Sequence, residues 1–260
     1  MTLEEAAQHL LSLSSSSATT STSTTSKPVA EEPARKHQKQ DEPLASPQSS
    51  RSLDEAALMM KSHPKDVLSI GKYVGALKHV PRTGWVLRKV PGRIESVAEH
   101  SFRAAVLGLL LNDDSLDIGR VVAIALVHDL AESIAGDIAP SQGISDEEKK
   151  KMEEDAMNTI LGQLNAPSAH KKIMEMWHEY EDRKTPEGKA VKDLDRFEMV
   201  LQADEYESKH ADLDLSEFFN SVRGKFTHPA VQRWFADLET RRNQRRSQLQ
   251  TNNSALDSKI

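Results

Sequence analysis

The chain contains no cysteine in its 260 residues. This absence excludes disulfides, thiolate metal ligands and cysteine nucleophiles together. Because it also fits a reducing compartment, we expect a cytoplasmic protein, and a nuclear one is compatible with the same composition. Any metal site must then use His, Asp and Glu side chains and backbone oxygens.

Long apolar runs and an excess of positive charge are also missing. No apolar run approaches the roughly 18 residues of a membrane span. The N-terminus, MTLEEAAQHLLSL, carries two acids and no Arg or Lys, unlike a secretory signal or a transit peptide. The formal net charge of −6 is opposite to the broad basic surface of a duplex-binding protein. We therefore expect neither a membrane nor a nucleic acid polymer as partner, although a small anion can still bind in a local basic pocket.

The first fifty residues have little to bury. Residues 14–26 read SSSSATTSTSTTS, and residues 27–50 are polar with four prolines. Such composition is typical of disorder. We predict a disordered Ser/Thr/Pro-rich tail over 1–51, one folded domain over 52–248 and a flexible C-terminal tail over 249–260.

Helix signals repeat from residue 52 onward. Capping-box patterns begin at Ser52, Ser96 and Ser145, and prolines suited to a first helical position lie at 64, 186 and 229. Apolar periodicity predicts helices over 53–62, 65–79, 96–111, 117–132, 146–164, 168–182, 187–209 and 229–247. The only strand-like segment is 85–90, which is too short to build a sheet. The predicted fold is an all-α helical bundle.

The strongest chemical signal is the pair His128-Asp129, which ends the apolar run 121–127. An imidazole and a carboxylate buried side by side without partners would be costly, and a divalent metal would satisfy both. A solvated His-Asp pair at a helix end is an equally good interpretation of this segment alone. His100, which begins an apolar helix, can likewise be a ligand or a core histidine.

An aspartate in the segment AVKDLDRFEMVL completes the candidate cluster. Asp195 is adjacent to the apolar stripe of its helix, whereas Asp193 is expected to be solvated. Glu132 lies one turn beyond the His-Asp pair if the helix continues, and Gly136 permits a turn that returns Asp137 toward the same place. Both carboxylates can then serve as general acid or base, or they can be surface charges at a helix end.

Arg82, Trp85 and Arg88 precede His100 by a short stretch. Arginine suits bidentate capture of phosphate, and Trp85 can pack on a sugar or a base. A core tryptophan in an amphipathic loop is an equal alternative. The basic cluster Arg241–Arg246 is expected to lie on a solvated terminal helix.

Several ordered motifs together resemble the HD-domain 5′-deoxynucleotidases, in particular their eukaryotic branch. The motifs are RTGWVLR from Arg82, ESVAEHS around His100, ALVHDLAESIAGDIAP from Ala125 to Pro140, and KDLD ending at Asp195. The resemblance continues through EMVLQADEYE and GKFTHP and covers about residues 53–245. It implies that 52–248 is an HD phosphohydrolase domain.

The resemblance also implies roles for individual residues. Its primary metal ligands would be His100, His128, Asp129 and Asp195, for Mn²⁺, Co²⁺ or Mg²⁺. Glu132 and Asp137 would act at the reacting phosphate, or would hold a second ion together with the Ile138 carbonyl. Arg82 or Arg88 would bind phosphate and Trp85 would line the sugar site. A homodimer is implied as well.

The expected reaction is hydrolysis of a deoxyribonucleoside 5′-monophosphate to deoxynucleoside and phosphate by a metal-activated water. Arginine would neutralise the phosphoryl oxygens, and Glu132 or Asp137 would move the proton that the leaving oxygen needs. The alternatives are an HD-type phosphodiesterase or nucleotide pyrophosphohydrolase on the same scaffold, or a non-catalytic interaction protein with a structural metal.

Overall fold

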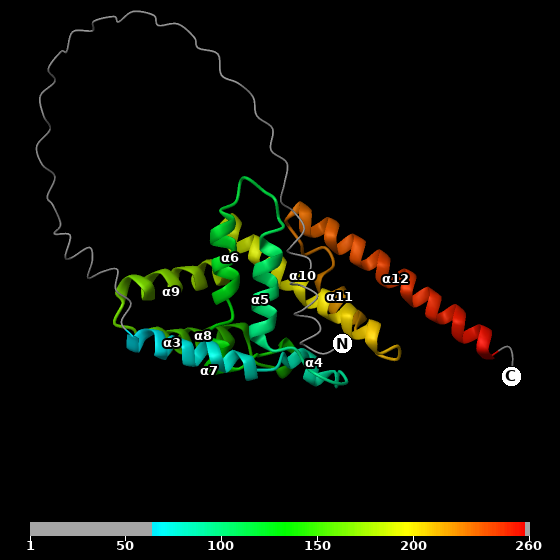
Figure 1. Cartoon of the computed structure of the whole chain (residues 1–260), viewed down its shortest axis with the longest axis horizontal. Coiled ribbons are helices and arrows are strands. Elements are labelled where there is room, and N and C mark those ends of the chain that lie inside the picture. The colour runs from blue at the N-terminus through cyan, green and yellow to red at the C-terminus, as the bar shows by residue number, and fades with distance from the viewer. Residues whose placement is uncertain (1–63, 258–260) are drawn as a thin grey trace, which may run out of the picture. The chain divides into compact units, whose positions relative to one another are not determined.

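The computed structural model describes residues 64–257 (Figure 1). The predicted N-terminal tail, the capping box at Ser52 and the helix expected over 53–62 lie outside the described residues. No helix in the described range combines the length and apolar character needed to cross a membrane.

The described residues are mostly helical, which confirms the all-α prediction for this part of the chain. One isolated bridge pairs Pro81 with Ser96 in antiparallel fashion. The elements in chain order are α3 (Pro64–Ala76), the 3-10 turn η1 (Leu77–His79), α4 (Thr83–Leu87), α5 (Val97–Gly108), α6 (Ile118–Val127), α7 (Glu132–Ala135), η2 (Pro140–Gln142), α8 (Asp146–Leu161), α9 (Pro167–Asp182), α10 (Pro186–Lys209), α11 (Ser216–Val222) and α12 (Pro229–Asp257).

Helix starts follow local chemistry closely. Ser96 and Ser145 each accept a hydrogen bond from the backbone of a glutamate three residues later, and that glutamate reaches back to the serine backbone. Both predicted capping boxes are therefore confirmed. The prolines at 64, 186 and 229 are the first residues of α3, α10 and α12, because a first helical residue needs no N–H partner.

The helix predicted over 117–132 is shorter than expected. α6 ends at Val127, with His128 as its C-cap. The chain then makes tight turns, in which Leu130 N donates to Val127 O and Glu132 N donates to Asp129 O, before α7 begins. The interruption separates the His128-Asp129 pair from Glu132 by a turn that apolar periodicity does not reveal.

Three further elements differ from the sequence prediction. The strand-like assignment of 85–90 is wrong, because Thr83–Leu87 is a helix that buries Trp85. The short helix α11 was not predicted, and α12 continues to Asp257 instead of ending at 247.

α5, α6 and α10 pack against one another and form the centre of the described fold (Figure 1). The approach is close at Gly108, where an added Cβ would lie 3.1 Å from Cγ1 of Val121. α9 packs on α6 and α10, while α3, α7 and α8 form a second contacting group. α6 therefore packs against α5, α9 and α10.

The basic cluster Arg241–Arg246 is not simply solvated, contrary to the sequence prediction. Arg242 is buried and its guanidinium donates to Glu207 on α10 at 2.6 and 2.7 Å. Arg245 donates to Asp204 at 2.6 Å. These pairs hold α12 against α10, so part of the cluster stabilises the fold.

Candidate metal centre

His100 reaches the centre of the fold from the first turn of α5. The Ser96 capping box fixes the start of that helix, and the imidazole is fully buried. Its Nδ1 donates to the carboxylate of Glu198 on α10. The opposite ring atom, Nε2, therefore faces the other candidate residues, in the orientation that an outer hydrogen bond gives to a metal-binding histidine.

His128 is oriented in the same way at the end of α6. Its Nδ1 donates to the carbonyl of Ala125 at 2.7 Å, which leaves Nε2 as the atom available for a ligand. Asp129 follows directly, and its Oδ2 lies 3.1 Å from His128 Nε2 and 3.7 Å from His100 Nε2. The end of α6 thus delivers both side chains to one point.

Asp195 on α10 lies on the opposite side of this point. Its Oδ1 is 3.2 Å from His100 Nε2, and its Oδ2 accepts hydrogen bonds from Tyr180 and Lys192. Asp193 lies elsewhere but is buried, where it accepts bonds from Thr227 and His228. The expectation that Asp193 is solvated is therefore wrong, although the structure does place Asp195 at the site.

Four buried polar atoms here have no hydrogen-bond partner among the described residues. They are Nε2 of His100, Nε2 of His128, Oδ2 of Asp129 and Oε2 of Glu132. Ligand atoms of His100, His128 and Asp195 lie within 4.8 Å of one another. Orphaned buried polar atoms are rare in native folds, and nitrogen and carboxylate oxygen are ligands that divalent metals prefer. The residues present fit a divalent metal.

A second grouping of possible ligands shares His100 with Glu95 and Glu198. Its members already have protein partners, because Glu198 accepts from Arg103 at 2.6 Å and Glu95 accepts from Trp85 Nε1 at 3.2 Å. This grouping is a network that orients His100, since its hydrogen bonds are satisfied without an ion.

The electrostatics of the site favour a cation. Burial and Arg82 lower the pKa of His100, but Glu198 and Asp195 outweigh them and raise it to about 10. Burial raises the pKa of Asp195, but Lys192 and His100 hold it well below its ordinary value. Positive charge at this point is thus stabilised by the surrounding carboxylates.

Glu132 and Asp137 lie next to the cluster. Glu132 begins α7 and is buried, and Gly136 ends that helix with a φ of 76°. The chain then turns as expected from the glycine, and Asp137 Oδ2 accepts from Thr83 N at 2.6 Å. Burial and the carboxylates of Asp129 and Asp137 raise the pKa of Glu132 well above its ordinary value. Glu132 therefore holds a proton more readily than an ordinary glutamate.

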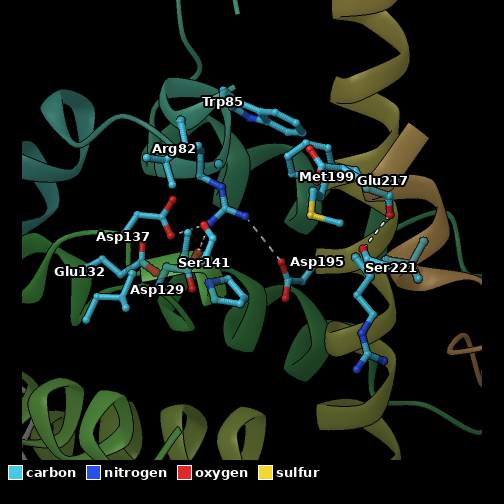
Figure 2. A pocket seen from close by; sticks show the side chains of 18 of the residues that line it. Arg82, Trp85, Asp129, Glu132, Asp137, Ser141, Asp195, Met199, Glu217 and Ser221 are labelled. Carbon is cyan, nitrogen blue, oxygen red and sulfur yellow. Dashed lines mark hydrogen bonds and ion pairs between the residues drawn. The ribbon is translucent and has the colours of Figure 1, made fainter. Parts of the chain in front are cut away.

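Arg82 is the cation that faces these carboxylates. Its backbone N donates to the carbonyl of Glu95 at 2.9 Å beside the Pro81–Ser96 bridge. In Figure 2 its guanidinium extends between Asp137 and Asp129 on one side and Asp195 on the other. The distances to these carboxylates are 3.6, 3.5 and 4.0 Å.

The cluster opens into a cavity of about 470 Å³, a size typical of small-molecule sites. Trp85 lines one wall (Figure 2) but is buried, with its ring against Tyr206 and Phe218. It is thus both a core residue and a cavity residue. Arg88 lies in the lining and forms an ion pair with Glu217. Ile138 lines the cavity as well.

Several residues of this centre were not found from the sequence. Glu198 and Arg103 orient His100, while Tyr180 and Lys192 hold Asp195. Glu198 lies three positions after Asp195, so its place on the same helix face was a usable signal. Tyr180 comes from α9 and had no signal, because its position depends on how α9 packs.

Comparisons with known proteins agree with this geometry. The HD domain family matches residues 74–234. The chain is 46% identical to human 5′-deoxynucleotidase HDDC2 over 179 residues, which is 68% of this chain and 87% of that protein. It is 44% identical over 173 residues to the Schizosaccharomyces pombe 5′-deoxynucleotidase hdd1, covering 65% of this chain and 86% of that protein.

A solved structure also resembles this fold. The solved structure of a conserved hypothetical protein from Pyrococcus furiosus superposes with a TM-score of 0.56 at 32% identity, over 66% of this chain and 99% of that chain. The sequence motifs, the fold and the relatives all indicate the same family. The chain therefore belongs to the HD-domain family and, within it, to the group of the 5′-deoxynucleotidases.

Proposed function

We propose that the chain is a metal-dependent phosphomonoesterase that hydrolyses deoxyribonucleoside 5′-monophosphates to the deoxynucleoside and inorganic phosphate. The observation that carries this proposal is the set of four unpartnered atoms on His100, His128, Asp129 and Glu132, two of which, Asp129 and Glu132, line a cavity that also presents Arg82. The names of the relatives support the substrate class.

The primary metal would be held by His100, His128, Asp129 and Asp195. A divalent ion of this kind supplies Lewis-acid activation of water and of the phosphoryl group. We propose Mn²⁺, Co²⁺ or Mg²⁺, which are the ions that the resemblance to the HD-domain 5′-deoxynucleotidases implies. Glu132, Asp137 and the Ile138 carbonyl would be the ligands of any second, oxygen-coordinated ion.

Arg82 is the residue that we assign to the phosphoryl oxygens. It is held beside the cluster by three carboxylates, and a guanidinium can turn two N–H groups toward a phosphate. Arg88 is the weaker candidate, because its Nε and Nη2 both donate hydrogen bonds to Glu217, whereas Arg82 meets its carboxylates as longer ion pairs of 3.5 to 4.0 Å. The partly apolar walls around Trp85 would receive the deoxynucleoside.

Glu132 is the residue that we assign to proton transfer. Attack of water on phosphorus breaks the bond to the 5′-oxygen, and that oxygen must take up a proton as it leaves. Burial and the neighbouring carboxylates raise the pKa of Glu132, which favours its protonated form and so suits it to donate a proton. Asp137 is engaged by Thr83 and Arg82, so its role would be to position Arg82 and the loop.

The test of this function is a substrate panel in which nucleosides, nucleotides and inorganic phosphate are separated by chromatography, because a phosphodiesterase would open a cyclic monophosphate without releasing phosphate. The panel contains deoxyribo- and ribonucleoside monophosphates, diphosphates and cyclic monophosphates, each with Mn²⁺, Co²⁺, Mg²⁺ or chelator. We expect release from the deoxyribonucleoside 5′-monophosphates alone, and only with metal. Turnover confined to cyclic or diphosphate substrates would instead identify a phosphodiesterase or a pyrophosphohydrolase. No turnover with any metal would favour an interaction protein.

We also propose that the chain is a homodimer. The supporting observation is a set of exposed apolar side chains on α5 and directly after it: Phe102 on α5 is 66% exposed, and Leu109 and Leu110, which follow its last residue, are 60% and 61% exposed. Exposed large apolar side chains that gather in one place are typical of a protein interface. Analytical ultracentrifugation would show a dimer for the wild type and a monomer for Phe102→Asp.

A further inference from the structure

Tyr180 contacts two of the four proposed metal ligands. It comes from α9, a helix that supplies none of those ligands, and is only 6% exposed. Its hydroxyl donates to Asp195 Oδ2 at 2.6 Å. Its ring meets the His128 ring edge-on, with the ring centroids 4.8 Å apart. One side chain thus touches the ligand at the end of α6 and the ligand on α10.

Lys192 completes the arrangement behind Asp195. Its Nζ donates to the Tyr180 hydroxyl at 2.6 Å and to Asp195 Oδ2 at 2.8 Å. It also lies 4.7 Å from the centroid of the Tyr180 ring. The Tyr180 hydroxyl therefore accepts a hydrogen bond from Lys192, and this leaves its own hydrogen to donate to the Asp195 carboxylate.

These bonds determine which oxygen of Asp195 faces the site. Oδ2 is engaged by two donors on the side of Tyr180 and Lys192. Oδ1 is turned toward His100 Nε2, which lies 3.2 Å away. A carboxylate without these donors would rotate among several orientations and would lose that freedom each time it bound an ion. The two donors pre-orient Asp195 instead.

The ring of Tyr180 acts on the second ligand. His128 has its Nδ1 hydrogen bond to Ala125, which fixes the tautomer. The edge-on contact with Tyr180 limits the tilt of the same ring. Both effects direct Nε2 toward Asp129 and His100.

We propose that Tyr180 is a positioning residue, which holds the Asp195 carboxylate with its hydroxyl and the His128 ring with its aromatic ring, so that both ligands are oriented to bind the divalent metal. This inference rests on the metal site of the proposed function. Hydrogen-bond partners of metal ligands typically contribute about 10- to 100-fold to metal affinity or activity.

The test compares two substitutions that each remove only a phenolic hydroxyl. Tyr180→Phe keeps the ring against His128 and leaves Lys192 bound to Asp195. Tyr73→Phe is the matched control, because the Tyr73 hydroxyl only accepts a bond from Gln163 at 2.6 Å in an exposed place. Binding of Mn²⁺ to the metal-free full chain is measured by calorimetry, without nucleotide. We expect about 10-fold weaker Mn²⁺ binding for Tyr180→Phe and wild-type binding for Tyr73→Phe.

A kinetic measurement separates positioning from substrate contact. At saturating Mn²⁺ the Tyr180→Phe chain should regain most of its kcat, with an unchanged KM for the deoxynucleotide. Wild-type Mn²⁺ affinity in Tyr180→Phe would overturn the proposal, and so would a raised KM with unchanged Mn²⁺ affinity. Failure of this variant to fold, judged by circular dichroism, would also overturn it, because the hydroxyl would then be structural.

The two proposals can fail separately. The Mn²⁺ titration contains no nucleotide, so it reports on Tyr180 whether or not the chain hydrolyses nucleotides. Weaker Mn²⁺ binding in Tyr180→Phe, combined with no phosphate release by the wild type, would support the role of Tyr180 and contradict the proposed function.

Discussion

Asp193 and Asp195 lie two positions apart on α10 and have different surroundings. Asp195 faces the two histidines, whereas Asp193 accepts hydrogen bonds from the backbone N of Thr227 and of His228, immediately before α12. The first carboxylate is placed to bind an ion, and the second satisfies backbone donors that would otherwise be buried without partners.

The two aspartates therefore form a matched pair of substitutions. Asp195→Ala should lose bound metal and activity, and it should also lose some stability, because Tyr180 and Lys192 lose their acceptor. Asp193→Ala should keep metal and lose about 2–3 kcal/mol of unfolding free energy, because buried donors are left unsatisfied. Elemental analysis and urea unfolding on both variants check this. Loss of metal in Asp193→Ala but not in Asp195→Ala would mean that the wrong aspartate is assigned.

Glu132 gives the second prediction at this scale. Glu132→Gln keeps the size of the side chain but cannot donate an acidic proton. We expect bound metal and nucleotide affinity near those of the wild type, with single-turnover phosphate release at least about 100-fold slower. Near-normal turnover would remove the acid-base role, and loss of metal would make Glu132 a ligand. Recovery of the rate at high Mg²⁺ would favour a second ion held by Glu132 and Asp137.

At the scale of helices, α12 is attached to α10 by a buried ion pair. Arg242 and Glu207 have side chains only 7% and 5% exposed. Arg242→Met would remove both hydrogen bonds from Arg242 to the buried Glu207. It would leave only the longer pairs with Arg245 and Arg246, at 3.9 and 3.7 Å, and we expect a loss of about 3 kcal/mol. The control is Arg241→Met, whose pair with Asp237 is largely exposed and should contribute less than about 1 kcal/mol. Equal urea midpoints for the two variants would contradict this account.

Helix starts were predictable from the sequence, and the break after α6 was not. Ser96, Ser145 and the prolines at 186 and 229 act through their own backbone neighbours, so local spacing is enough to predict them. The turn between Val127 and Glu132 depends on what α6 meets at its end. Trp85 was wrongly assigned to a strand-like segment, because its position depends on packing against Tyr206 and Phe218. That packing is a tertiary contact, which the local sequence does not reveal.

In the candidate site, too, the residues with a local sequence signal were predicted and those placed by tertiary packing were not. His100, His128, Asp129 and Asp195 were identified through ordered motifs, and the fold brings them to one point. The residues that orient them were missed. Tyr180 in particular reaches Asp195 only because α9 packs on α10, and no periodicity within α9 indicates that contact.

At the scale of the whole molecule, residues 1–50 are expected to be dispensable. The segment is Ser/Thr-rich and has no apolar stripe with which to dock. Deleting it should leave turnover and the Tm nearly unchanged. A fall in Tm of more than about 4 °C, a kcal/mol-scale loss for a domain of this size, would show that the segment packs on the fold.

The central claim is that the cluster of two histidines and two aspartates holds the ion on which hydrolysis depends. The most direct test is one titration, in which metal-free full-length chain receives Mn²⁺ while bound metal and phosphate release from a deoxyribonucleoside 5′-monophosphate are measured on the same preparation. The account predicts no release without metal and a rate that rises in proportion to occupancy of the first site. Full activity in the metal-free chain, or a fully loaded chain that releases no phosphate, would contradict it.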